Sequence, residues 1–226
     1  MEESFSYTNM WINDTTPVRL DSVLSCEATF RNSIVNADVS IWDVSNVIDM
    51  SRMFKSAKQF NQDLSSWDVS SVQFMEEMFM DADLFDQNLN NWDVSNVISL
   101  AGMFKYAGSF NQPLNQWDVS GVLDMNDLFF EARSFNQDIS VWDVSNVVDM
   151  SGMFTGSQFN YDLNNWDVSN VKDMRRMFQT PAFNGAIDQW DVSQVEDMRL
   201  MFSDAAIFDQ DLSAWDVSQV RDMSFM

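Results

Sequence analysis

The chain has 226 residues and is strongly acidic, with 35 Asp and Glu against 12 Lys and Arg and a formal net charge of −23. Such a charge repels phosphate backbones and anionic lipid headgroups, which disfavours nucleic acid and a bare membrane as partners. Because 46% of the residues are hydrophobic, including 19 Phe and 9 Trp, the composition argues against disorder and for a packed aromatic core.

The N-terminal segment, residues 1–17, is polar and acidic and has neither the basic start nor the apolar run of a signal peptide. We expect it to form a cap over the first repeat. Residues 18–34 resemble a degenerate copy of the repeat that follows, because they keep Val23 and Phe30 while Cys26 replaces a methionine. An atypical end repeat is typical of solenoids, whose first layer has one uncovered face.

One short repeat fills the rest of the chain. The tetrapeptide Trp-Asp-Val-Ser occurs eight times at intervals of 24 or 25 residues, and with the degenerate copy this gives nine repeats over 18–226, the last of them truncated. The repeated frame is Phe-Asn, two residues, Leu or Ile, two residues, Trp-Asp-Val-Ser, one residue, Val, two residues, Met, two residues, Met-Phe. The eight copies begin at Trp42, Trp67, Trp92, Trp117, Trp142, Trp166, Trp190 and Trp215.

Two periods within the repeat predict its secondary structure. Trp67 and Val69 alternate with the polar Asp68, which predicts a short strand with the tryptophan and valine inward. Four apolar residues then fall at i, i+3, i+4 and i+7, the spacing of one face of a short helix: Met50, Met53, Phe54 and Ala57. One parallel strand and one helical turn per repeat predict a right-handed α/β solenoid.

The same frame carries a family resemblance that covers nearly all of 18–226. The motif F-N-x-x-L-x-x-W-D-V-S-x-V-x-x-M-x-x-M-F resembles the 25-residue repeat of bacterial surface proteins and mycoplasma lipoproteins of unknown function. That family is related to the leucine-rich repeats of BspA-like surface proteins. The resemblance implies a leucine-rich-repeat-like solenoid, a place at the cell surface or outside the cell, a role in adhesion or surface variation, and no catalytic residues. The chain itself shows no targeting signal.

An exposed aspartate column is the first candidate binding feature. Stacked at about 4.8 Å on a concave strand face, such carboxylates would repel one another, so something should compensate them. Each aspartate could accept backbone N–H bonds at the turn with the following serine. The alternatives are a basic protein partner or Ca²⁺ bound by neighbouring Asp and Ser oxygens. No other metal or cofactor is predicted. The column comprises Asp43, Asp68, Asp93, Asp118, Asp143, Asp167, Asp191 and Asp216.

Three other features have structural interpretations. An Asn column is expected to turn inward and bond the backbone of successive coils, and a second acidic column is expected at helix starts, where the helix dipole favours it. Arg175 and Arg176 are expected to pair with nearby acids, and Cys26 to be a buried, inert thiol. The columns comprise Asn61, Asp86, Asn111, Asn136, Asn160, Asn184 and Asp209, and Asp49, Asp124, Asp149, Asp173, Asp197 and Asp222.

The sequence predicts a binding protein and not an enzyme. There is no histidine to activate a nucleophile, no phosphate-cradling or zinc motif, and a repeated ladder makes its carboxylates alike, whereas acid–base catalysis needs them unequal. We expect an interaction module that presents an acidic face to a protein or glycan. The alternative is a structural scaffold subunit, stacked end to end or built into a larger assembly. Candidate contact residues, which depart from the polar consensus, are Phe74, Met80, Tyr106 and Phe130.

Overall fold

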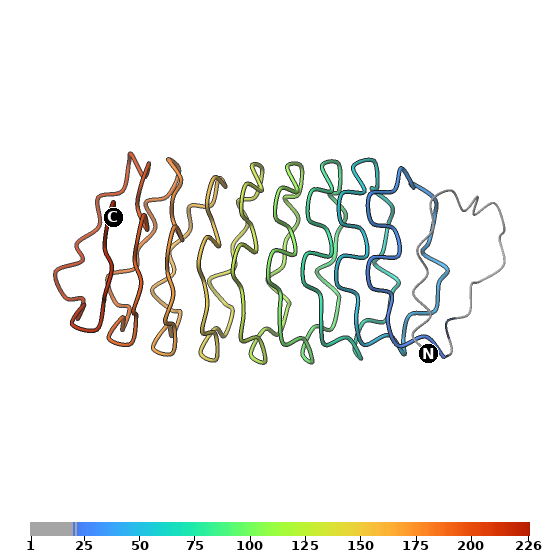
Figure 1. Cartoon of the computed structure of the whole chain (residues 1–226), viewed down its shortest axis with the longest axis horizontal. Helices are drawn as coiled ribbons and strands as arrows, with labels where there is room; N and C mark the ends of the chain where they lie inside the picture. The colour runs from blue at the N-terminus through green and yellow to red at the C-terminus, as the bar shows by residue number, and fades with distance from the viewer. Residues whose placement is uncertain (1–19, 21) are drawn as a thin grey trace.

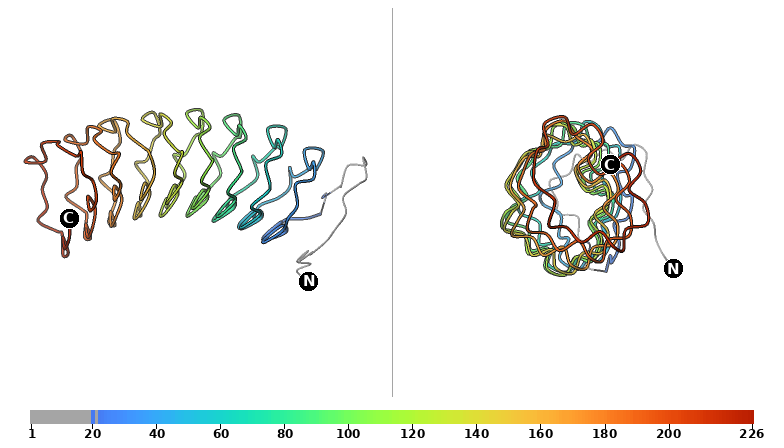
Figure 2. Two further views of the ribbon diagram at one scale, coloured as in Figure 1. Left: turned by 90° about the horizontal axis from the view of Figure 1, so that it is seen from above. Right: turned by 90° about the vertical axis from the view of Figure 1, so that its left-hand side faces the viewer.

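The computed structural model describes residue 20 and residues 22–226, so the expected cap over 1–17 lies outside the described residues. The chain winds into successive coils that stack side by side along one long axis (Figure 1). Seen along that axis the coils superimpose, and seen from above the stack is gently curved (Figure 2). Each coil corresponds to one repeat of the sequence.

The predicted α/β fold of leucine-rich-repeat type is wrong. Residue 20 and residues 22–226 contain no helix and no extended strand. Their sheet-like pairing consists of isolated parallel bridges, one per coil, which run from Ser25 to Asp222. The bridges join Ser25 to Asp49, Asp49 to Phe74, Phe74 to Ser99, Ser99 to Asp124, Asp124 to Asp149, Asp149 to Asp173, Asp173 to Asp197 and Asp197 to Asp222.

A row of turns takes the place of the predicted helix. In residues 50–56, alternate N–H groups donate to the next coil, as Met50 does to the Phe74 carbonyl at 2.9 Å and Phe54 to the Met78 carbonyl at 2.9 Å. Between them, Met53 and Lys55 donate to the residue three positions back, Met53 to Met50 at 3.2 Å, while Ser51 donates to the Asp49 carboxylate at 2.9 Å. This alternation requires left-handed backbone at two positions, Arg52 (φ 60°) and Ser56 (φ 57°). A helix would direct every bond within the coil, so the two patterns exclude each other.

The predicted strand around Trp67 is also a turn, although the direction of its side chains is as expected. Trp67 and Val69 are buried and Asp68 is exposed. The Trp67 N–H donates to the Leu64 carbonyl at 3.0 Å, and Val72 closes a second turn onto Val69 at 2.9 Å. The apolar pattern therefore predicted what is buried, but not the backbone that buries it.

Aromatic rings fill the inside of the coils. Phe79 stacks on Phe85 of its own coil at 3.9 Å between ring centroids and on Phe104 of the next coil at 5.8 Å. Each tryptophan from Trp67 on also bonds a buried carbonyl of the preceding coil, as Trp92 Nε1–H does to Leu64 O at 3.0 Å. Since a buried polar group left unpaired is costly, this bond explains why the position takes tryptophan and not phenylalanine.

The coil has two sides, which we define by sequence. The Trp–Asp side consists of the runs 35–47, 60–72, 85–97, 110–122, 135–147, 159–171, 183–195 and 208–220. The Met–Phe side consists of the runs between them, from 22–34 to 221–226. Among the described residues, backbone–backbone bonds between coils lie on the Met–Phe side, with one exception, Leu163 N–H to Ala186 O. The Trp–Asp side is joined from coil to coil through side chains.

Candidate binding groove on the Met–Phe side

The predicted aspartate column lies on the Trp–Asp side, where every member is exposed. Each carboxylate accepts the N–H of the serine two residues on, and four also accept its hydroxyl; Asp68 Oδ1 receives the Ser70 N–H at 3.1 Å and Oγ at 2.6 Å. These bonds lower the pKa of Asp68, with the serine hydroxyl as the largest cause. Within the described residues, no group of three or more His, Cys, Asp or Glu side chains is arranged to hold a metal ion.

The Asn column joins coils as predicted, but it is not turned inward. The Asn61 side-chain oxygen accepts the N–H of Asp86 at 2.9 Å, and Asn136 does the same for Asn160 at 3.1 Å. All members of the column are partly or fully exposed. The second acidic column marks the parallel bridges and not helix starts, and Asp49 accepts the Ser51 N–H at 2.9 Å. The predicted interaction with a helix dipole is therefore wrong.

Two of the predicted contact residues lie together. Tyr106 meets Phe130 of the next coil edge to face, with ring centroids 5.4 Å apart. Lys105 Nζ lies 4.7 Å from the centre of the Phe130 ring and donates to Asp127 at 2.6 Å. Met80 is half-buried one coil before Tyr106 on the same row of turns, whereas Phe74 lies in the column of parallel bridges. The structure thus forms a small aromatic and cationic cluster from Lys105, Tyr106 and Phe130.

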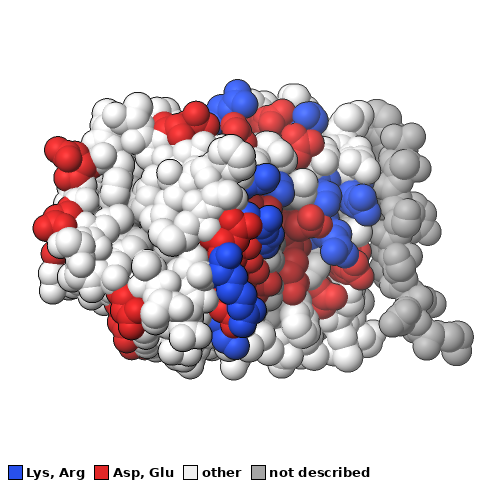
Figure 3. All heavy atoms as spheres, turned by 60° about the vertical axis from the view of Figure 1, so that its left-hand side comes forward, with Lys and Arg blue, Asp and Glu red and all other residues white. Residues whose placement is uncertain are grey.

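All the Lys and Arg residues that the structure describes lie on the Met–Phe side. Its described runs hold 15 acidic and 11 basic residues, whereas the runs of the Trp–Asp side hold 16 acidic and no basic residues. Acidic and basic side chains interleave along a hollowed band of the surface (Figure 3). A chain that is acidic overall therefore has one side of nearly balanced charge.

A groove of about 590 Å³ lies on the Met–Phe side near this cluster. Its lining includes Asp127, Gly152, Arg176 and Leu200, which occupy the same left-handed position in four successive coils. A methyl group at Gly152 would meet the Asp127 carboxylate and would lie 3.4 Å from Phe130. Arg, Glu, Asp and Leu all occupy this position in other coils, so the backbone does not demand glycine here. Gly152 instead leaves room for the Asp127 carboxylate beside the aromatic cluster.

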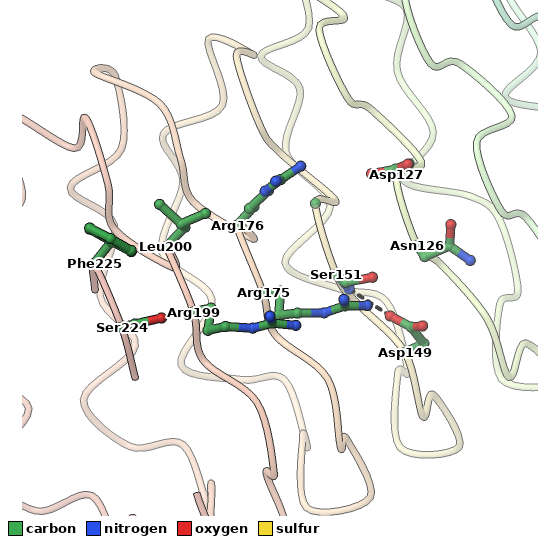
Figure 4. Close-up of a pocket in the computed structure, with 11 residues that line it drawn as sticks. Asn126, Asp127, Asp149, Ser151, Arg175, Arg176, Arg199, Leu200, Ser224 and Phe225 are labelled. Atoms are coloured by element: carbon green, nitrogen blue, oxygen red, sulfur yellow. Dashed lines mark hydrogen bonds between the residues drawn. The ribbon is translucent and has the colours of Figure 1, made fainter. Parts of the chain in front are cut away.

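Three arginines line the groove, and two of them are paired. Arg175 Nη2 contacts Asp173 at 2.7 Å, and Arg199 Nη2 contacts Asp197 at 2.8 Å. Within the part of the chain that the structure describes, no carboxylate lies within 4.0 Å of the Arg176 guanidinium. The expected ion pair is therefore confirmed for Arg175 and wrong for Arg176. In Figure 4, Arg175 and Arg199 extend side by side toward Asp149, while Arg176 extends separately toward Asp127.

Two titratable groups of the Met–Phe side, Asp149 in the groove and Cys26 in the first repeat, have raised pKa values. Burial raises the pKa of the Asp149 carboxyl, against the opposing effect of its bonds to Ser151, and the neighbouring Asp173 and Asp124 add to the rise. Burial also raises the pKa of the Cys26 thiol to about 11, with Asp49 as a second cause. At neutral pH Cys26 is thus a buried thiol and not a thiolate, as predicted.

The groove was not predicted from the sequence. Its signals are two local departures from the consensus, a glycine at 152 and a pair of arginines at 175 and 176, which lie about one repeat apart and become neighbours on stacking. No helix of the described residues is long and apolar enough to cross a membrane.

Comparison with known proteins yields one match at the level of family. A model described as "Mycoplasma protein of unknown function, DUF285" matches residues 1–116, 99–182 and 157–226, which together span the sequence. These tandem matches confirm a repeat protein similar to mycoplasma proteins. No curated protein and no solved structure matches the chain.

Proposed function

The chain belongs to the DUF285 family of mycoplasma repeat proteins of unknown function, and we propose that it is a non-catalytic interaction module that binds a partner protein through its Met–Phe side. The observation that carries this proposal is where the variation lies. The Trp–Asp side keeps its Trp, Asp, Val and Ser residues in coil after coil and varies at the uncharged position before each Trp, while the Met–Phe side exchanges basic, acidic and apolar residues at equivalent positions, such as Arg52, Glu77, Asp127, Arg176 and Leu200.

The stacking bonds account for this contrast. On the Trp–Asp side the coils are joined by indole side chains and by the Asn and Asp residues of the Asn column, so those residues must recur for the coils to stack. On the Met–Phe side the backbone supplies the bonds, so the outward side chains are free to differ. A surface that varies without loss of stability is suited to recognition.

The cluster of Lys105, Tyr106 and Phe130 is the proposed contact centre. Tyr106 is 40% exposed, and aromatic residues beside a cation are typical of the energetically dominant residues in protein interfaces. Mixed charge around the cluster gives the surface a pattern that a partner can match, and complementary charges chiefly add specificity and association rate. A location at the cell surface and the kinship with BspA-like surface proteins belong to the same proposal, and support for them comes from the repeat motif.

Site-specific crosslinking tests the proposal. A photoreactive phenylalanine analogue is introduced at Tyr106 or, as a matched control, at Val141, an exposed apolar residue of the Trp–Asp side. We expect one defined partner to crosslink from position 106 and not from 141. The recovered partner is then titrated calorimetrically against the chain carrying Tyr106→Ala and Phe130→Ala, and we expect at least a tenfold loss of affinity. Crosslinking from 141 alone, or unchanged affinity of the double variant, would refute the proposal.

A further inference from the structure

The Met–Phe side contains two arginines at equivalent positions with opposite surroundings. Arg52 lies between two acids, with Nη1 2.9 Å from Glu27 and Nε 2.8 Å from Glu77. Arg176 occupies the same left-handed position, with φ 58° against 60°. Its neighbours in that column are Gly152 and Leu200, neither of which carries charge. The charge of Arg52 is thus compensated inside the molecule, and that of Arg176 is not.

The groove beside Arg176 has Gly152 in its lining, and the Asp127 carboxylate lies over that glycine, in the place where a side chain at 152 would begin. The Asp127 carboxylate is engaged by Lys105 at 2.6 Å, so its charge is already compensated. Arg175 and Arg199, which also line the groove, are held by Asp173 and Asp197. Among the arginines of the lining, Arg176 is therefore the one whose charge has no ion pair in the described residues, and the Asp149 carboxylate, which also lines the groove, accepts the Ser151 N–H at 2.8 Å.

From these contacts we propose that the groove binds a carboxylate side chain of an acidic peptide segment on the Leu200 side of Arg176, away from Asp127, with Arg176 as its ionic partner. A guanidinium presents planar donors that match the two oxygens of a carboxylate. The apolar Leu200 and Phe130 border the opening, so an acidic residue flanked by an apolar residue fits it best. This inference deepens the proposed function, because it names the chemistry of the partner at that surface.

The net charge of −23 does not prevent such binding. At physiological ionic strength the Debye length is about 8 Å, so distant acids of the Trp–Asp side are largely screened while a direct contact with Arg176 is not. The segment 172–182 that carries Arg176 contains three basic residues and one acidic residue. The groove lining itself holds three arginines and two aspartates.

The test follows the guanidinium by NMR. Full-length chain labelled with ¹⁵N is titrated with a capped Glu-Leu-Glu tripeptide at constant ionic strength, and the Arg Nε–Hε and Gly152 amide signals are recorded. We expect saturable shifts at Arg176 and Gly152 and none at Arg52. A capped Gln-Leu-Gln tripeptide should shift neither, because it lacks the carboxylates.

Two variants provide the matched comparison. Arg176→Gln should weaken tripeptide binding at least tenfold, whereas Arg52→Gln, in the same column, should leave it unchanged. Gly152→Asn, which keeps a residue type tolerant of left-handed backbone, should displace the Asp127 carboxylate into the groove and also abolish the shifts. Linear shifts, equal shifts at both arginines, unchanged binding of Arg176→Gln, or full displacement by equimolar inorganic phosphate would overturn the inference.

The outcome is separable from that of the proposed function. A partner lost with Tyr106→Ala and Phe130→Ala, together with a tripeptide that shifts nothing, would keep the function and remove the carboxylate site. Saturable tripeptide binding with no partner at the aromatic cluster would do the reverse.

Discussion

The Trp–Asp and Met–Phe sides of the coil are joined to the next coil by different kinds of hydrogen bond. Both sides must join one coil to the next, and both contain apolar side chains that are fully buried. The Trp–Asp side does so with side-chain bonds, such as Trp117 Nε1–H to Leu89 O at 2.9 Å. The Met–Phe side does so with backbone bonds, such as Phe104 N–H to Leu128 O at 3.0 Å.

The difference shows which repetition carries information about function. The Asp-Val-Ser turns recur because each aspartate satisfies the serine that follows it, and this need is the same in each coil. The residues of the Met–Phe side are released from that constraint. A repeated surface in a protein of this kind is therefore weak evidence for a binding site, and a varied one is stronger evidence.

The largest expected effect on stability is a difference between two adjacent phenylalanines. Phe129 is fully buried and stacks on Phe135 at 3.7 Å, whereas Phe130 is only half-buried on the Met–Phe side. We expect Phe129→Ala to lower the free energy of unfolding by about 3–5 kcal/mol and Phe130→Ala by less than about 1 kcal/mol. Urea unfolding followed by tryptophan fluorescence measures both. Equal losses would show that the exposed rings belong to the core and would remove the distinction between the two sides.

A second test removes one side-chain bond of the Trp–Asp side. Trp117→Phe leaves the buried Leu89 carbonyl without its indole donor, which should lower the free energy of unfolding by about 1–3 kcal/mol. The control is Asn126→Ser on the Met–Phe side, which introduces the residue found at the equivalent positions 151 and 224 and should have almost no effect. Two equal effects in urea unfolding would mean that side-chain identity matters equally on both sides.

A smaller effect distinguishes the acceptor role of an aspartate from its charge. Asp118→Ala removes the acceptor of the Ser120 N–H and hydroxyl and should lower the free energy of unfolding by about 0.5–1 kcal/mol. Asp118→Asn keeps an oxygen at the same place and should be nearly neutral. If thermal denaturation instead shows the same loss for both variants, the negative charge is required, and a cationic ligand of the column gains support.

The smallest effect is a difference in titration between two acids of one coil. Bonds from Ser145 lower the pKa of Asp143 on the Trp–Asp side, while burial raises that of Asp149 on the Met–Phe side. The stability due to Asp143 is therefore present above the unfolded pKa of about 3.9 and is lost as the pH falls through its lowered value. The pH dependence for Asp149 is the reverse. The stability that it contributes is present below the unfolded pKa and is lost as the pH rises through its raised pKa in the folded protein. Carboxyl ¹³C shifts recorded against pH should place the two midpoints on opposite sides of about 3.9.

The sequence predicted the buried residues better than the backbone. Met50, Met53, Phe54 and Ala57 are all fully buried, as their spacing indicates. That spacing fits a helix, but it fits equally well a row of turns in which alternate N–H groups leave the coil. Glycine, the usual sign of left-handed backbone, fills only three of the positive-φ positions, while thirteen other residues share that conformation. Nothing in the pattern of residue types therefore distinguished turn from helix.

The groove was not predicted from the sequence, and the reason is different. Its residues are unremarkable within any one repeat, and they become a site only when five coils place residues 127, 152, 176, 200 and 225 side by side. The aspartate column was predicted as a binding feature because it repeats. Its repetition follows from the turn that each aspartate closes by accepting the serine N–H. Comparison of equivalent positions between repeats, looking for departures from the shared pattern, would have found Gly152 and Arg176.

The alternating bonds of the turn row also determine how the molecule responds to force. Because those bonds point along the stack, tension applied to the two ends pulls coils apart one after another and does not shear all the bonds at once. Each released coil of 25 residues adds about 80–90 Å of extended chain, so a single-molecule extension trace should show a regular series of equal steps. We therefore expect the stack to extend gradually under load, one coil at a time, and to shorten again when the load is removed.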